Sequence, residues 1–99
     1  MHVIWKYPLE ATDVQMVKMP KGAKILCVQT QGQTPCLWAL IPDTKATLEE
    51  RHFSIYGTGH LHEKIPGTYI GTFQLMNGQL VFHVFETEAS HKTMRKILW

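Results

Sequence analysis

The residues with the clearest capacity for chemistry form one short segment, Gly57-Thr58-Gly59-His60. Glycines allow backbone N–H groups to converge on an anion, the threonine adds a hydroxyl, and the histidine can donate a hydrogen bond or carry charge. The segment lacks the pattern of a P-loop, and G-T-G also occurs in many plain turns. On this pattern alone we favour a turn, and we keep a phosphate-binding loop as the functional interpretation.

Other residue types could extend this loop into a nucleotide site. Arg51 can pair with a phosphate, and Tyr56 and Trp38 can stack on a base. Trp38 alternates with the core-like Cys36 and Leu40, which favours a core position for its side chain. The candidate ligand-binding residues are Gly57, Thr58, Gly59, His60, Arg51, Trp38, Thr72 and His83.

The chain contains six histidines, which raises the question of a metal site. His60 and His62 are two residues apart and would share one face of a strand. His83 or Glu63 could then supply a third ligand. The sequence has neither an H-E-x-x-H motif nor a Cys/His ligand pattern, and unliganded histidines are ordinary in exposed loops. We predict no metal and no cofactor, and keep a small metal-dependent hydrolase using His60, His62 and His83 as an alternative.

Catalysis by a nucleophile or a carboxylate pair is not indicated. Neither cysteine nor any serine lies in a nucleophile-elbow pattern, and no two carboxylates are fixed on facing strands. His83 is predicted opposite Thr72, which favours a half-buried, hydrogen-bonded histidine over a general base. We therefore predict a protein that is not an enzyme.

The elements that must position these residues centre on a hairpin over 67–86. Two runs rich in β-branched and aromatic residues flank Asn77-Gly78, the dipeptide preferred in a type I′ turn. Pairing residues whose numbers sum to 155 divides the hairpin into a core face and a mixed face. We expect any site or subunit contact in the hairpin on the mixed face. The core face holds Phe73, Leu75, Leu80, Phe82 and Val84, and the mixed face holds Ile70, Thr72, Gln74, Val81, His83 and Phe85.

Further strands are predicted over 2–7, 13–19 and 51–56, and a second hairpin over 23–29 and 34–41. A turn at Gln31-Gly32 would place Cys27 opposite Cys36, and we favour two reduced, buried thiols over a disulfide. Both faces of this second hairpin are apolar, as in a closed structure or at a contact with another copy. We predict a mostly β domain over 1–89, a single small antiparallel β-barrel or sandwich, with a short basic amphipathic helix over 90–99.

Composition limits the classes of partner. With 99 residues and 44% hydrophobic content the chain is sized for one domain with one core. A net charge of +2 and a pI near 8.6 are too mild to predict binding along a nucleic-acid backbone. The sequence has no apolar run long enough to span a membrane and no signal-peptide pattern at its start, so we expect a cytoplasmic protein without membrane contact.

Five separated blocks resemble a family of small phage and prophage proteins that is catalogued as a domain of unknown function. The blocks are I-W-K-Y-P-L, M-P-K-G-A-K-I-L-C-V-Q, C-L-W-A-L, G-T-G-H and Y-I-G-T-F-Q-L-M-N-G-Q-L-V-F-H-V-F-E. The resemblance covers about residues 4–86 and leaves the segment after Glu86 outside. It implies a phage origin, a compact β-rich fold and a place in the cytoplasm of an infected or lysogenic bacterium.

The resemblance and the residues together give our functional expectation. Small phage proteins of this size often counter host defence, which predicts a non-catalytic binding protein that sequesters a nucleotide immune signal. An alternative is an inhibitor or adaptor, similar in role to an anti-CRISPR protein, that docks on a protein or nucleic-acid complex through the basic 90–99 segment. The expected partners are a second copy of the chain and either a nucleotide-type small molecule or a host defence protein. We expect no direct binding of free nucleic acid.

Overall fold

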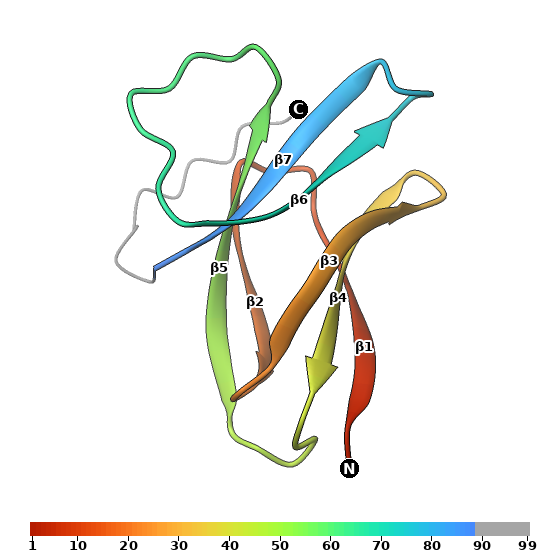
Figure 1. Cartoon of the computed structure of the whole chain (residues 1–99), viewed down its shortest axis with the longest axis vertical. Coiled ribbons are helices and arrows are strands. Elements are labelled where there is room, and N and C mark those ends of the chain that lie inside the picture. Colours follow the sequence, from red (N-terminus) through yellow and green to blue (C-terminus); the bar gives the residue numbers. More distant parts are fainter. Residues whose placement is uncertain (89–99) are drawn as a thin grey trace.

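The computed structural model describes residues 1–88 and contains seven β-strands in that range. They are β1 (Val3–Pro8), β2 (Val14–Pro20), β3 (Lys24–Gln31), β4 (Thr34–Ile41), β5 (Leu48–Gly57), β6 (Thr68–Leu75) and β7 (Leu80–Thr87). One antiparallel sheet has the order β1-β4-β3 and the other the order β2-β5-β7-β6 (Figure 1). Residues 1–88 contain no helix, and the predicted 90–99 helix lies outside the described residues.

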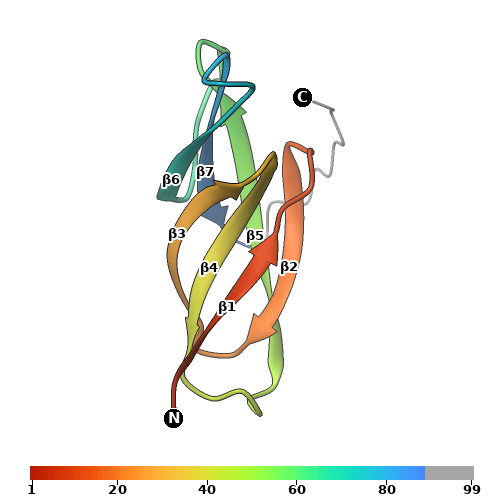
Figure 2. The same cartoon turned by 90° about the vertical axis from the view of Figure 1, so that its right-hand side faces the viewer.

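The two sheets pack against each other as a sandwich, with the three-stranded sheet in front of β2 and β5 when viewed as in Figure 2. Their inner faces share one apolar core, which confirms a sandwich. The alternative of a closed barrel is wrong, because within residues 1–88 no backbone ladder joins the two sheets. The buried core residues are Leu9, Met19, Ala23, Val28, Leu37, Ala39, Ile41, Phe53, Ile55, Phe73, Phe82 and Val84.

The sheets meet through side chains where β3 passes β6. A Cβ atom built on Gly71 would lie 2.8 Å from Cγ1 of Val28, so a glycine is needed for this close approach. Packing of one strand's side chain on another strand's backbone thus takes the place of the hydrogen bonds that would have closed a barrel.

The β6–β7 hairpin has the predicted register from Gly71 opposite Val84 to Leu75 opposite Leu80. Asn77 and Gly78 both have positive φ, at 55° and 87°, and the N–H of Gln79 donates to the carbonyl of Met76 at 3.1 Å. These features fit the expected type I′ turn. Met76 before it also has a positive φ, of 52°, and the N–H of Gly78 donates to the carbonyl of Leu75 at 3.2 Å, so the left-handed backbone spans three residues.

Beyond Gly71 the predicted hairpin register is wrong. A β-bulge between Tyr69 and Gly71 shifts the pairing, so that Tyr69 and not Ile70 lies opposite Phe85. Tyr69 therefore joins the mixed face. On the core face Phe73, Phe82 and Val84 are buried as predicted, whereas Leu80 is 39% exposed.

The predicted register of the β3–β4 hairpin is also wrong. The predicted turn residues were Gln31 and Gly32, whereas the observed ones are Gly32 and Gln33. Gly32, with a φ of 65°, takes the first central position, where type II′ turns require a positive φ. Cys27 therefore lies opposite Trp38, and Cys36 opposite Gln29. Both cysteines are free thiols, as expected, but only Cys36 is buried, and the predicted burial of Cys27 is wrong because its side chain is partly exposed.

The buried face of this hairpin is the one carrying Val28, Leu37, Ala39 and Ile41. Trp38 points to the other face and is only partly buried, so its favoured place in the core is wrong. In the described part of the chain, no helix has the length and apolarity needed to cross a membrane.

Candidate functional site

The predicted glycine-rich segment lies where β5 ends and the long 58–67 loop begins, drawn in green at the upper left of Figure 1. The backbone turns tightly here, with the N–H of His60 donating to the carbonyl of Gly57 at 3.3 Å and Gly59 at a φ of 86°. Thr58 is tied to the neighbouring strand through its N–H, which donates to the carbonyl of Val81 at 3.1 Å. The loop is thus a turn anchored on β7.

Four aromatic rings gather beside the loop on the outer face of the four-stranded sheet. The rings of Tyr56 and His62 meet edge to face with centroids 4.7 Å apart. Phe85 contacts Tyr56 at 5.7 Å and Tyr69 at 5.5 Å, also edge to face. Such contacts fix ring orientation and offer apolar surface to a planar ligand.

A chain of hydrogen bonds runs through His83 in the middle of this face. Its Nε2 lies 2.7 Å from the hydroxyl oxygen of Thr58, and its Nδ1 lies 2.9 Å from the hydroxyl oxygen of Thr72. That oxygen lies 2.6 Å from the phenolic oxygen of Tyr69. The predicted contact between His83 and Thr72 is confirmed, and Thr58 and Tyr69 extend it in both directions.

The direction of these hydrogen bonds follows from the far end of the chain. The Thr58 hydroxyl can also donate to the carbonyl of Val81, at 3.3 Å, and a carbonyl only accepts. When Thr58 donates there, it accepts from Nε2–H of His83, and Nδ1 accepts from the hydroxyl of Thr72. This arrangement satisfies every group with a neutral imidazole. Both ring nitrogens of His83 are thus hydrogen-bonded within the protein.

Two pockets lie on either side of the loop. The first, of 290 Å³, is on the outer face, and none of its described lining residues is acidic; they are Tyr56, Gly57, Thr58, Gly59, His60, His62, Ile65, Tyr69, His83 and Phe85. The second, of 540 Å³, has a mainly apolar lining with Asp13 as its carboxylate. Both share Tyr56, Gly57, Thr58, His60 and His62.

Most predicted site residues come together at the outer pocket. Its lining includes the whole segment 57–60 and His83, and Thr72 stands one hydrogen bond behind the imidazole. Sequence reasoning missed Tyr69, because the bulge that turns it onto this face leaves no clear signal in the sequence. Phe85 had been placed on the mixed face but was not selected.

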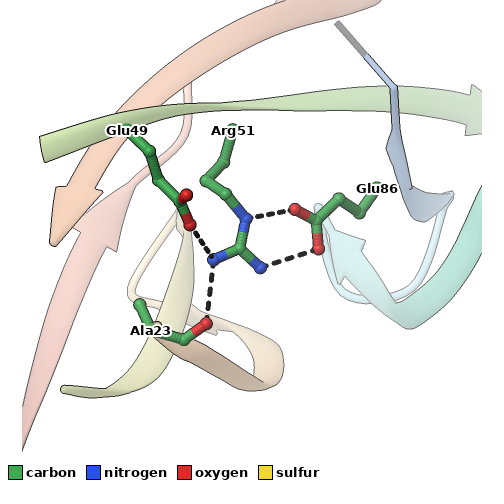
Figure 3. Close-up of polar contacts among 4 residues, drawn as sticks. All are labelled: Ala23, Glu49, Arg51 and Glu86. Carbon is green, nitrogen blue, oxygen red and sulfur yellow. Dashed lines mark hydrogen bonds and ion pairs between the residues drawn. The ribbon is translucent and has the colours of Figure 1, made fainter. Parts of the chain in front are cut away.

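Arg51 lies apart from this pocket, on the inner side of the sheet (Figure 3). Its Nε and Nη2 donate to the two carboxylate oxygens of Glu86, the second bond being 3.0 Å long, and its Nη1 donates to the carbonyl of Ala23 at 2.8 Å. Glu49 approaches Nη1 to 3.5 Å. The hydrogen bond with Glu86 is the main cause that raises the pKa of Arg51, against an opposing effect of burial. All three guanidinium nitrogens are thus engaged within the protein.

Trp38 is also remote, because it belongs to the three-stranded sheet. The ammonium of Lys6 lies 6.0 Å from the centre of its ring, at the limit of a cation–π contact. The histidines likewise do not form a metal centre: within residues 1–88, no three His, Cys, Asp or Glu side chains are placed to hold an ion.

Comparison with known proteins identifies a family. A family model, described as a domain of unknown function (DUF7352), matches residues 1–95. The match runs past Glu86, so the expectation that the segment after Glu86 lies outside the family is wrong for residues up to 95. Among curated proteins and among solved structures, none matches the chain. Because the family model spans nearly the whole sequence, the chain belongs to this family of unknown function.

Proposed function

We propose that this protein is a non-catalytic binding protein that takes up a nucleotide-type small molecule in the outer pocket. The observation that carries the proposal is the meeting, in one pocket, of the 57–60 backbone with His83 and three aromatic side chains. Imidazole N–H groups, as on His60 and His62, suit a phosphate, and aromatic rings suit a base. A lining without a described acidic residue also favours an anion.

The volumes of the two pockets limit the size of the ligand. Pockets for small molecules are about 300 to 1,000 Å³, so the outer pocket, of 290 Å³, suits one nucleotide unit. The pocket of 540 Å³ on the other side of the loop shares five residues with it, so a larger ligand would contact the same loop from both sides. Cyclic dinucleotides and ADP-ribose derivatives are therefore the first compounds to test.

The biological role that we propose is interference with host defence by a protein of phage origin, in the cytoplasm of the infected cell. The support is the resemblance of five sequence blocks to phage proteins, together with a pocket fit for a nucleotide signal. A protein that only sequesters a signal needs a binding site and no catalytic group. This matches an imidazole held by hydroxyls alone.

Isothermal titration calorimetry with cyclic dinucleotides and ADP-ribose derivatives tests the binding proposal. We expect at least one of them to bind the purified protein with micromolar or tighter affinity. Native mass spectrometry of protein taken from cells would reveal a ligand that co-purifies. If no compound binds and the protein carries none from the cell, the proposed function is wrong.

A variant series can place a bound nucleotide at the loop. A Cβ on Gly57 would lie 2.9 Å from Cε1 and 3.0 Å from Nδ1 of His60, so Gly57→Ala should displace that imidazole without removing it. We expect both Gly57→Ala and His60→Ala to weaken binding about tenfold, which is the loss of one charge-assisted hydrogen bond. In the double variant, Gly57→Ala should add nothing to His60→Ala. Additive losses of binding free energy would mean that Gly57→Ala acts through the backbone and not through the position of the His60 ring.

The proposed role in infection has its own test. Bacteria whose defence depends on a nucleotide signal would be challenged with phage while expressing either the wild-type protein or His60→Ala. We expect the wild type to restore plaque formation and His60→Ala to restore less. If the two restore it equally, the protein acts through some other surface.

A further inference from the structure

Strand β1 leaves an unusual amount of apolar surface in contact with water. It is the edge strand of the three-stranded sheet, and in residues 1–88 only β4 pairs with it. Val3, Ile4 and Trp5 are 36%, 57% and 38% exposed, and Lys6 is its one ordinarily charged residue. Soluble proteins usually protect an exposed edge with charges, bulges or a covering element. None of these devices is present along Val3–Trp5 in the described structure.

The other strands at the sheet edges differ from β1. β3 and β6 pack on each other where Val28 meets Gly71. β2 has two exposed residues, Met16 and the charged Lys18, and its Val17 and Met19 side chains face the core. The other edge strands each expose single large apolar residues, such as Leu26 on β3 and Tyr69 on β6, whereas β1 exposes three in a row. Among the described strands, β1 is therefore the apolar edge best suited to accept one more antiparallel strand.

The charges on β1 indicate which strand fits. If a second copy of β1 pairs antiparallel with the first, the core-facing sides of the two sheets must lie on the same side. This holds only in registers in which the numbers of two directly opposed residues sum to an even value. A sum of 12 places Lys6 opposite the partner's Lys6, and a sum of 8 places His2 opposite Lys6. A sum of 10 places Trp5 opposite its own copy and Lys6 opposite Ile4, so it avoids both contacts between basic residues.

We propose that the protein forms a two-fold symmetric dimer by pairing β1 with β1 of a second copy in this register. The two three-stranded sheets become one six-stranded sheet, β3-β4-β1 continued by the same strands of the partner. The Val3–Trp5 surface is then covered by its own equivalent, and the unpaired backbone groups of the edge are satisfied. The interface is separate from the ligand pocket, which is built on β5–β7 and the 58–67 loop.

A charge series at Ile4 tests the dimer and its register by sedimentation equilibrium. We expect the wild-type protein to be a dimer at micromolar concentration. Ile4→Lys places two new lysines opposite the two Lys6 side chains and should raise the dimer Kd about fivefold, since each cross-strand pair occurs twice. Ile4→Glu creates two opposite-charge pairs and should lower it by a similar factor. The double variant Ile4→Lys/Lys6→Glu also creates two opposite-charge pairs, so its Kd should fall below the wild-type value, to about that of Ile4→Glu.

Leu61→Lys is the matched control. Leu61 is 98% exposed and lies in the loop between β5 and β6, which belong to the other sheet. It should leave the dimer Kd unchanged, and circular dichroism should show the same β-structure for every variant. A wild-type protein that is monomeric at high micromolar concentration would overturn the proposal. So would a dimer whose Kd does not respond to the sign of the charge at position 4.

Discussion

Two clusters of polar residues lie on opposite faces of the same pair of strands, β5 and β7. On the inner face Arg51 joins Glu86, and on the outer face Tyr56 and His83 are paired residues beside the 58–67 loop. Both Arg51 and His83 were selected from the sequence as ligand-binding residues. Only His83 lines a pocket.

The difference lies in the partners that the fold provides. The guanidinium of Arg51 is held by a carboxylate on β7 and by the Ala23 carbonyl just before β3, so it ties the two sheets together (Figure 3). His83 is held by hydroxyls, which are neutral, can rotate and keep the capacity for another hydrogen bond. A partly buried cation paired with a partly buried carboxylate ties the sheets together, whereas a neutral imidazole between exposed hydroxyls lines a pocket.

The largest effect on stability is expected from breaking the inner cluster. Arg51→Met leaves the Glu86 carboxylate without its cation and the Ala23 carbonyl without its donor, and should lower the free energy of unfolding by about 3 kcal/mol. Urea denaturation measures this loss. Glu49→Gln is the control, because Glu49 approaches Arg51 only to 3.5 Å, and it should cost less than about 1 kcal/mol. Equal losses for the two variants would contradict the structural role of Arg51.

A smaller loss is expected where the 58–67 loop returns to the sheet. Gly67 has a φ of 102°, and a Cβ there would lie 2.3 Å from the carbonyl oxygen of Glu86, so Gly67→Ala should cost about 2 kcal/mol. Gly32→Ala is matched to it, because Gly32 also has a positive φ, of 65°, but nothing lies within 4 Å of its Cβ. Thermal unfolding should show the smaller loss for Gly32→Ala. The reverse order would mean that the clash at Gly67 is relieved by movement of the loop.

The outer cluster should matter least for stability. His83→Ala removes two hydrogen bonds between exposed groups and should cost about 1 kcal/mol, and Thr72→Val about half of that. Urea denaturation of both variants beside Arg51→Met would sharpen the comparison. A loss from His83→Ala as large as that from Arg51→Met would show that both clusters build the fold.

The smallest expected effect is on the position of the proton on the neutral imidazole of His83. The hydrogen-bond directions set by the Val81 carbonyl place the proton of neutral His83 on Nε2. Nitrogen-15 chemical shifts of the histidine ring at a pH where it is neutral report the tautomer. Thr58→Val removes the acceptor for Nε2–H and should make the two tautomers more equally populated. A proton on Nδ1 in the wild type would mean that the hydrogen bonds between His83 and its two threonine partners run in the opposite direction.

Local chemistry made part of the fold predictable. The Asn77-Gly78 turn fixed the register of its hairpin for five residue pairs, because few dipeptides accept two positive φ angles. Gly32 alone was ambiguous, since a glycine can take either central position of a tight turn. That ambiguity shifted the predicted β3–β4 register by two residues and brought Cys27 and Cys36 together wrongly.

The site was predictable to the same extent. The 57–60 segment is local, and His83 reaches Thr72 through a register that the turn determines, so it was predictable that these residues could lie on one face. The place of Arg51 away from the pocket was not predictable, because its partner Glu86 is 35 residues away and no local pattern reveals that pairing. Tyr69 was missed because the bulge beside it alters which side chains share a face.

The position of β5 inside its sheet has a consequence for how the protein acquires its function. β5 pairs on one side with β2 and on the other with β7, and both partners are distant in sequence. Pairing of distant strands is slow, on the order of milliseconds to seconds for β-sandwiches. The Arg51–Glu86 cluster and the Tyr56–His83 face both require β7 to be paired with β5. A chain in which β7 has not paired thus lacks the outer pocket, and a ligand bound there should protect the whole four-stranded sheet from unfolding.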